Sequence, residues 1–383
     1  MDCGNIEKVW IFKIMKLNNK QSSSRKFIII TYLVLILIYL STLLIFPFAQ
    51  RFVNYVLLND KAESHVSSFN NLSTKKNTLQ HRFLCKPLDT NSSYNKSNSP
   101  SRDAILLFAT RYNAGLDLAL KSLKATQSRA QVILFTNERE FYANDDAKKF
   151  MNSMNIKIIT DCKEDPNVTR VRGTNSAVPH MLRFKCERDW IKENINNIDR
   201  VLHSDAYDIF FQNDPFQPYE DHDLIGYDKL TFVVEPHFIR GCGWNLAWFT
   251  HCYGPETTRK FEDNFIICSG TIAGSASDYL KLVEMMISQE EWKTCYSPSH
   301  DQPILNYLLW SKKIEEAGIK YTLAGCDGGF ATLQWCTLNM KVDYDEYGQV
   351  VLPSKVVPSY IHQYPRIPGL SDHLFEACGI KKY

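Results

Sequence analysis

The sequence predicts an α/β domain with a mainly parallel sheet over residues 102–383. Short apolar runs, each long enough for one buried strand, alternate there with segments whose apolar residues recur at helical spacing. This alternation is typical of parallel sheets whose two faces are covered by helices. Composition agrees, because 44% hydrophobic and 22% charged residues are ordinary values for a folded protein. The formal net charge of +2 gives no indication of a nucleic acid partner.

The first half of the domain sets out this alternation in order. Strands are predicted at 104–110, 131–137, 156–161 and 200–205, and helices at 115–125, 138–154 and 176–195. In such sheets, ligands bind outside the carboxyl ends of the strands. The residues that directly follow each strand are therefore the first candidates for a functional site.

Ahead of this domain, residues 27–48 predict one transmembrane helix. The segment holds 22 residues without a charge, and at about 1.5 Å per residue it spans the hydrocarbon core of a bilayer. Its apolar stretch is too long for a cleaved signal peptide, and no small-residue cleavage site follows. Basic residues predominate in 1–26, so the positive-inside rule predicts a cytosolic tail there and a lumenal remainder of the chain.

Residues 49–101 predict a lumenal stem, because small polar side chains dominate most of this stretch. Segment 81–88 differs, since it carries apolar residues and Cys85, and we expect it to be attached to the folded domain. N-x-[ST] sequons predict glycosylation in the stem and early domain, at Asn71, Asn91, Asn95 and Asn167.

Ten of the eleven cysteines lie beyond residue 84, an even number that suits up to five disulfides in an oxidising compartment. The closest pairs along the chain are Cys242 with Cys252 and Cys326 with Cys336, but spacing alone assigns no bridge. A cysteine-based metal site is disfavoured because no C-x2-C pair is present.

The segment RVLHSDAYDIFFQNDPF, residues 200–216, carries the most informative pattern. Asp205 and Asp208 follow a buried strand, and two carboxylates so close together repel each other unless a cation lies between them. Oxygen ligands suit hard ions such as Mg²⁺ or Mn²⁺. The alternative is a loop in which an aspartate caps the following turn, and Asp214 in the NDP sequence is more typical of such a turn residue.

In its wider context this segment resembles the glycosyltransferases of the GT-A fold that carry a DxD-type metal motif. The likeness covers roughly 103–365 and is greatest to D-x-x-D variants such as the glycosyltransferase domain of the procollagen lysyl hydroxylases. It implies a Rossmann-like domain in which Asp205 and Asp208 bind Mn²⁺, or Mg²⁺, and Asp205 approaches the donor ribose. A late histidine, His362 in VPSYIHQYPR, would complete the ligands; the alternative is a structural histidine.

The resemblance also implies donor-binding and catalytic residues elsewhere. FIICSGTIAG at 265–274 would bring Ser269 and Gly270 to the sugar, or form an ordinary turn between strand and helix. In HDQPILNYLLW, Asp301 would bind the sugar or act as base and Gln302 would contact the sugar; Asp301 is equally suited to cap the helix that begins near Pro303. The remaining expected donor contacts and the second candidate base are Thr110, Arg111, Tyr112, Arg183 and Glu235.

The aromatic tract 235–254 has two interpretations, a sugar-contacting surface or a core loop held by disulfides. The whole pattern predicts a type II membrane glycosyltransferase of the Golgi, rather than the endoplasmic reticulum, that transfers a sugar from a nucleotide sugar, most simply a UDP-sugar, to a glycan or glycoprotein. Two alternatives stay open: a metal-dependent phosphodiesterase or hydrolase, and a non-catalytic lumenal binding protein derived from such a transferase.

Overall fold

A computed structural model of the chain describes residues 83–86, 102–136, 141, 145–160, 162, 179–219, 222–223, 225–296, 298–325, 328–334 and 341–381. The predicted cytosolic tail at 1–26, the transmembrane helix at 27–48, nearly all of the stem and the four sequon asparagines lie outside these residues. Within them, no helix combines the length and the apolar character needed to cross a membrane.

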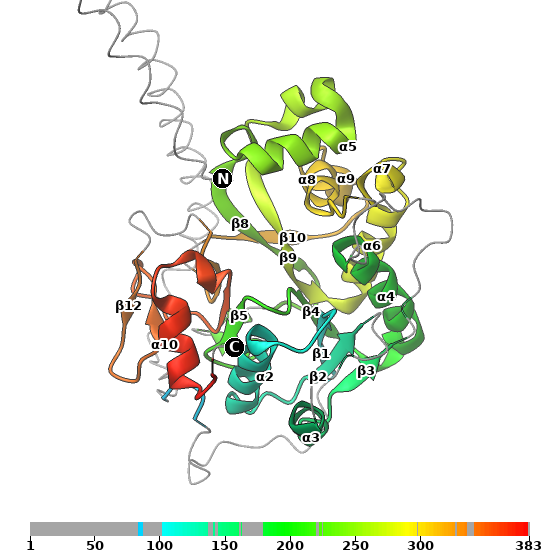
Figure 1. Ribbon diagram of the computed structural model, residues 1–383. Helices are drawn as coiled ribbons and strands as arrows, with labels where there is room; N and C mark the ends of the chain where they lie inside the picture. Colours follow the sequence, from blue (N-terminus) through cyan, green and yellow to red (C-terminus); the bar gives the residue numbers. More distant parts are fainter. Residues whose placement is uncertain are drawn as a thin grey trace, which may run out of the picture. The chain divides into compact units, whose positions relative to one another are not determined.

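The domain is built on a mixed, mainly parallel sheet with the order β10-β8-β9-β4-β1-β2-β3 (Figure 1). Strand β1 is parallel to β2 and to β4, whereas β9 is antiparallel to both β4 and β8. The strands are β1 (Asp103–Phe108), β2 (Gln131–Phe135), β3 (Lys157–Ile159), β4 (Arg200–Ser204), β8 (Leu230–Phe238), β9 (Phe265–Ser275) and β10 (Tyr321–Ala324). The predicted α/β class is thus confirmed, and each strand predicted in the first half forms within a few residues of its expected bounds.

Helices cover both faces of this sheet. Alternate side chains of β1 enter two different cores: Leu106 packs with the helices of one face, and Ile105 and Leu107 pack with those of the other. The helices are α2 (Ala114–Ala125), α3 (Asp145–Ser153), α4 (Pro179–Asn194), α5 (Gly243–Phe261), α6 (Ala276–Ile287), α7 (Trp292–Tyr296), α8 (Gln302–Trp310), α9 (Lys313–Glu316) and α10 (Leu370–Ala377), with short 3-10 turns at Ile195–Asn197, Ile239–Gly241 and Tyr364–Arg366. A strand buried on both faces needs apolar residues throughout, which explains the unbroken run that predicted it.

A second, smaller sheet packs against the first one. Its order is β11-β14-β5, from β11 (Phe330–Thr332), β14 (Tyr360–His362) and β5 (Ile209–Phe211). One face shares a core with α2 and the main sheet, and the other packs on α10. The remaining strands form short antiparallel pairs: β6 (Pro218–Tyr219) with β7 (His222–Asp223), and β12 (Asp343–Tyr344) with β13 (Val350–Val351).

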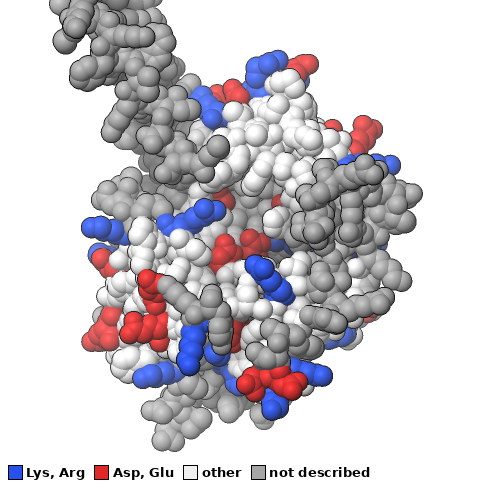
Figure 2. All heavy atoms as spheres, viewed as in Figure 1, with Lys and Arg blue, Asp and Glu red and all other residues white. Residues whose placement is uncertain are grey.

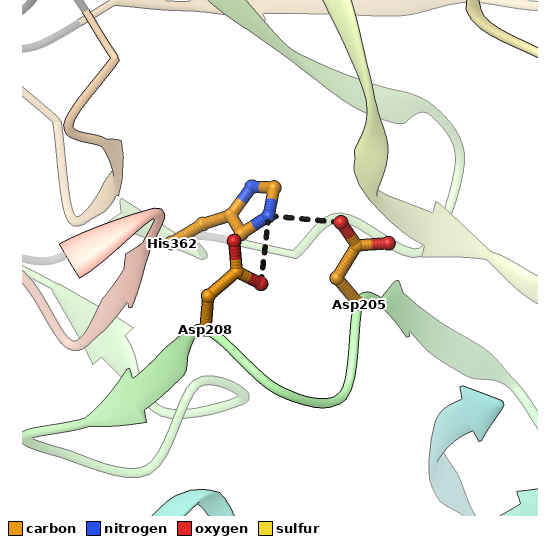
Figure 3. Close-up of side chains that lie close together, drawn as sticks. All are labelled: Asp205, Asp208 and His362. Atoms are coloured by element: carbon orange, nitrogen blue, oxygen red, sulfur yellow. Dashed lines mark hydrogen bonds and ion pairs between the residues drawn. The ribbon is translucent and has the colours of Figure 1, made fainter. Parts of the chain in front are cut away.

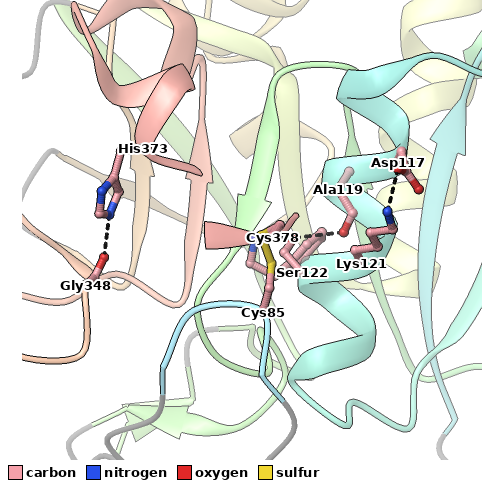
Figure 4. The surroundings of a disulfide bond; sticks show 9 residues. Cys85, Asp117, Ala119, Lys121, Ser122, Gly348, His373 and Cys378 are labelled. Atoms are coloured by element: carbon pink, nitrogen blue, oxygen red, sulfur yellow. Dashed lines mark hydrogen bonds and ion pairs between the residues drawn. A yellow bond between two sulfur atoms is a disulfide. The ribbon is translucent and has the colours of Figure 1, made fainter. Parts of the chain in front are cut away.

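Disulfides join segments that are distant in sequence. Cys85 bonds Cys378 just after α10 (Figure 4), and Leu84 beside it is buried in the same core as α10. The expected attachment of 81–88 to the domain is confirmed for its described residues. The other bridges are Cys162–Cys186 and Cys252–Cys295.

Chain proximity did not predict these pairings. Cys252 bonds Cys295, 43 residues away, and not its near neighbour Cys242. Five bridges are not reached either, because Cys268 is a buried thiol. Cys326 and Cys336 lie outside the described residues.

Candidate metal centre and its cavity

Three strands bring together the side chains of Asp205, Asp208 and His362 (Figure 3). Asp205 directly follows β4, and Asp208 directly precedes β5, so the D-x-x-D segment is the connection between the two sheets. Strand β14 pairs antiparallel with β5 and places His362 opposite Ile209. The backbone N–H of Gln363 donates to the carbonyl of Asp208 at 2.8 Å and fixes this register.

The three side chains have the geometry of a compact ligand set. One donor atom from each lies within 4.8 Å of the others. Nε2 of His362 is 3.1 Å from Oδ2 of Asp205 and 3.5 Å from Oδ1 of Asp208. The His362 side chain is 1% exposed, whereas those of Asp205 and Asp208 are 30% and 33% exposed. Two carboxylates and an imidazole at the edge of solvent suit Mn²⁺, and Mg²⁺ less well.

Gly270 provides the space in which these ligands meet. A Cβ at position 270 would lie 2.6 Å from Oδ2 of Asp205 and 2.6 Å from Cε1 of His362. The residue lies in β9, beside β4, and its carbonyl accepts from the backbone N–H of Asp205 at 2.9 Å. Ser269 and Gly270 therefore belong to a strand, and the alternative of a turn between strand and helix is wrong.

Arg183 on α4 holds the other side of Asp205. Its guanidinium donates to Oδ1 of Asp205, to Oδ2 of Asp301 at 2.5 Å and to the carbonyl of Ser269 at 3.1 Å. Burial alone would raise the pKa of the Asp205 carboxyl, but Arg183 and His362 hold it well below its usual value. Asp205 is thus kept ionised, with one oxygen on Arg183 and the other on the ligand side.

The far ring nitrogen of His362 is also held. Nδ1 lies 3.1 Å from the hydroxyl of Thr271 and 3.5 Å from the thiol of Cys268. A second partner on the distal nitrogen is what orients a metal-binding histidine. Burial by itself would lower the pKa of His362, but the surrounding groups, Cys268 and Asp208 foremost, raise it well above its usual value.

The cluster opens into a cavity of about 580 Å³. In Figure 2, acidic residues (red) are visible in a hollow near the middle of the face shown. The cavity is lined by residues from β8, β9, α4, α5, α8 and β14, among them His180, Arg183, Asp205, Glu235, Trp244, Trp248, Ser269, Gly270, His300, Asp301, Gln302, Gln334, His362 and Arg366. Most of the predicted site residues therefore surround one space.

Asp301 and Gln302 serve the architecture of this cavity. Oδ1 of Asp301 accepts from the backbone N–H of Gln302 at 2.8 Å and so caps α8, as one of the two interpretations predicted. Gln302 accepts from the backbone N–H of Ser269 at 3.1 Å and donates to Asn245 at 2.7 Å. Both side chains are buried and tie α8 to β9 and α5.

Glu235 is a buried carboxyl group on the cavity wall. It lies within β8, which continues to Phe238. Burial is the main reason that its pKa is raised to about 7, although Cys268, Gln363 and the positive charges nearby partly oppose this effect. A carboxyl group with a pKa near neutrality can accept a proton at physiological pH.

Thr110, Arg111 and Tyr112 follow β1, and the latter two line a second hollow of about 500 Å³. The hydroxyl of Tyr207, the third residue of the D-x-x-D segment, accepts from the backbone N–H groups of Thr110 at 2.8 Å and Arg111 at 3.0 Å. Gly115 lets α2 approach this segment, because a Cβ there would lie 2.1 Å from the carbonyl oxygen of Tyr207. The predicted nucleotide-binding residues and the metal ligands are thus joined through one short loop.

A buried hydrogen-bond network behind the site was not predicted from the sequence. Nδ1 of His203 lies 2.8 Å from a carboxylate oxygen of Glu187, which also accepts from the hydroxyl of Tyr279, and Nε2 lies 3.0 Å from the carbonyl of Ser269. His203 and Glu187 are fully buried. The one available signal was His203 itself, a polar residue in an apolar strand just before Asp205. Asp214, by contrast, accepts from the backbone N–H of Phe216 at 3.1 Å, as expected of a turn residue.

Neither the known protein families nor the curated protein sequences contain a match to this chain. Its function must therefore be argued from the site.

Proposed function

We propose that this chain is a metal-dependent glycosyltransferase of the GT-A type that transfers a sugar from a nucleotide sugar, a UDP-sugar in the simplest case, to a glycan or glycoprotein. The observation that carries the proposal is the Asp205–Asp208–His362 cluster, which opens into a cavity large enough for a sugar nucleotide. The cluster follows β4, next to the carboxyl end of β1, where ligands bind in parallel sheets.

The residues present fit a divalent ion of the manganese or magnesium type. Asp205 is held ionised, His362 is oriented by Thr271, and Gly270 leaves open the space in which the ligands converge. A bound ion supplies positive charge that stabilises a diphosphate leaving group. Thr110, Arg111 and Tyr112 remain the proposed contacts for the nucleotide.

Of the two candidate bases, Glu235 is the better placed. Asp301 uses one carboxylate oxygen to cap α8 and the other to bind Arg183, so each oxygen already has a partner within the fold. Glu235 lines the cavity, and its raised pKa suits proton transfer. Ser269 and Gln302, which bond each other, shape the cavity wall on which the transferred sugar would lie.

The cellular setting is proposed from the sequence together with the bridges. Residues 27–48 would anchor the chain in the Golgi membrane as a type II protein, with the stem and its glycosylated asparagines in the lumen. The disulfides between Cys85 and Cys378, Cys162 and Cys186, and Cys252 and Cys295 are consistent with an oxidising lumen.

A binding experiment tests the proposal with the full-length chain solubilised in a detergent that has no sugar headgroup. UDP is titrated by calorimetry with Mn²⁺, with EDTA, and with Mn²⁺ on the variant Asp208→Asn. The matched control is Asp228→Asn, which changes a side chain that is 73% exposed and paired only at the surface with Lys320. We expect binding to wild type and to the control with Mn²⁺, and none with EDTA or with Asp208→Asn.

A folded wild-type chain that binds no UDP under any condition would contradict the nucleotide assignment. Equal UDP binding with EDTA and with Mn²⁺ would contradict the metal centre. UDP-sugar turnover then separates the rivals: a transferase releases UDP from UDP-sugars, a phosphodiesterase releases UMP, and a binding protein releases neither.

A further inference from the structure

One wall of the cavity takes no part in the metal centre. Trp244 and Trp248 lie one helical turn apart near the start of α5, and both line the cavity with part of their surface exposed. The disulfide from Cys252 to Cys295 joins α5 to α7 and holds this helix in place. The aromatic tract is thus held by a disulfide and lines the cavity, but it forms the end of β8 and the start of α5 and is not a core loop.

The two tryptophans contact residues that are close in sequence to His362 and to Asp301. The guanidinium of Arg366, four residues after His362, lies 5.9 Å from the ring centroid of Trp244. The ring of His300, directly before Asp301, lies 5.2 Å from that of Trp248. A molecule resting against the exposed parts of the two indoles would therefore lie within the cavity that Asp205 and His362 also line.

Three buried polar atoms on residues that line this cavity have no hydrogen-bond partner among the described residues. They are Nε of Arg183, Nδ1 of His300 and Oε1 of Gln334. A buried polar group without a partner destabilises the fold. Nε of Arg183 is a donor, Oε1 of Gln334 is an acceptor, and Nδ1 of His300 is either one according to the tautomer, so the residues that line this cavity carry both kinds of group.

We propose that Trp244 and Trp248, with His300 and Gln334 of the same cavity, form the acceptor subsite and that it takes a carbohydrate ring. The inference rests on the proposed function. A pyranose has an apolar C–H face that packs on an indole ring and a rim of hydroxyls that both donate and accept, which matches this wall. An acyl lipid would leave the polar atoms unpaired, and a peptide hydroxyl would leave most of the aromatic surface uncovered.

Saturation-transfer NMR on the full-length chain, in a detergent without a sugar headgroup and with UDP and Mn²⁺ present, tests the subsite. The probes are the methyl glycosides of glucose, galactose, mannose and N-acetylglucosamine, with a blocked threonine peptide as the rival. At least one glycoside is expected to bind wild type, and Trp244→Ala and Trp248→Ala are each expected to weaken that binding about tenfold. Trp248→Phe keeps an aromatic face and should retain most of it.

The control variant is Tyr344→Ala, which removes an aromatic side chain that is 44% exposed and lies outside the cavity. Unchanged UDP affinity in the tryptophan variants would show that the fold and the donor site are intact. Glycoside binding that survives both alanine substitutions would place the sugar elsewhere and overturn the proposal, as would binding of the peptide alone or of no probe. Should wild type bind a glycoside but no UDP, the proposed function fails while the tryptophan variants still decide the subsite.

Discussion

Replacement of Gly270 by alanine should abolish tight metal binding while leaving the domain folded. The added Cβ would lie 2.6 Å from Asp205 and from His362, about 1 Å closer than a relaxed contact of about 3.5 Å. His362 is 1% exposed and cannot retreat, whereas Asp205 is 30% exposed and can turn outward. The displaced ligand should cost about 10–100-fold in metal affinity, or about 1.4–2.8 kcal/mol.

The free Mn²⁺ signal in electron paramagnetic resonance gives the dissociation constant directly, without a substrate. Gly325→Ala is the matched control, because its added Cβ would meet nothing within 4 Å. Thermal unfolding of the metal-free proteins should show a smaller change than the metal affinity does. A Gly270→Ala protein with the wild-type dissociation constant for Mn²⁺ would refute the geometry inferred for the ligand set.

Further predictions concern charge and covalent structure. The pKa of Glu235 is about 7 in the folded protein, whereas its ordinary value is 4.5. Between pH 4.5 and about pH 7 the folded state therefore binds more protons than the unfolded state, and the fold loses stability as the pH rises through this range. The unfolding free energy of Glu235→Gln should therefore rise relative to that of wild type, by about 2–3 kcal/mol, as the pH is raised from 5 to 8. A difference between the two proteins that does not change with pH, in urea unfolding with EDTA present, would contradict this. Because the pKa of His362 is raised, a proton competes with the metal for this side chain. At pH values below that pKa, the Mn²⁺ affinity should rise up to about tenfold for each unit by which the pH is raised. A calorimetric Mn²⁺ affinity that does not change with pH would count against His362 as a ligand. Cys378→Ser removes a bridge between cysteines that are 293 residues apart in sequence and should lower the free energy of unfolding by about 2–5 kcal/mol. Trypsin should then cut beside Lys86. Thermal unfolding and trypsin cleavage that match wild type would show that the bridge is dispensable.

The sequence was sufficient to predict those features that depend on a short segment of the chain. The apolar runs that became β1 and β2, and the apolar pair Val201 and Leu202 in β4, are buried on both faces of the sheet. The position of Asp205 at the end of such a run followed from the same pattern. The cap on α8 was also legible, because Asp301 stands just before Gln302 and Pro303.

The pairing of strands that are distant in sequence could not be predicted in this way. His362 reaches Asp205 across 157 positions only because β14 pairs with β5 in one register. Without the resemblance, nothing in VPSYIHQYPR distinguished that histidine from a structural one. Gly270 was expected to contact a sugar, but the β4–β9 pairing turns its missing side chain toward the metal ligands. Such registers depend on the assembled sheets and on no short segment.

The bond between Cys85 and Cys378 determines how the domain would carry mechanical load. A pull on the chain ahead of Cys85 enters the domain by two covalent routes, along the backbone after Cys85 and through the sulfur atoms to the end of α10. The three-stranded sheet with its metal ligands lies inside that closed ring of chain. Motion of a tether on the N-terminal side would therefore move the domain as one body, without peeling β1 from its neighbours.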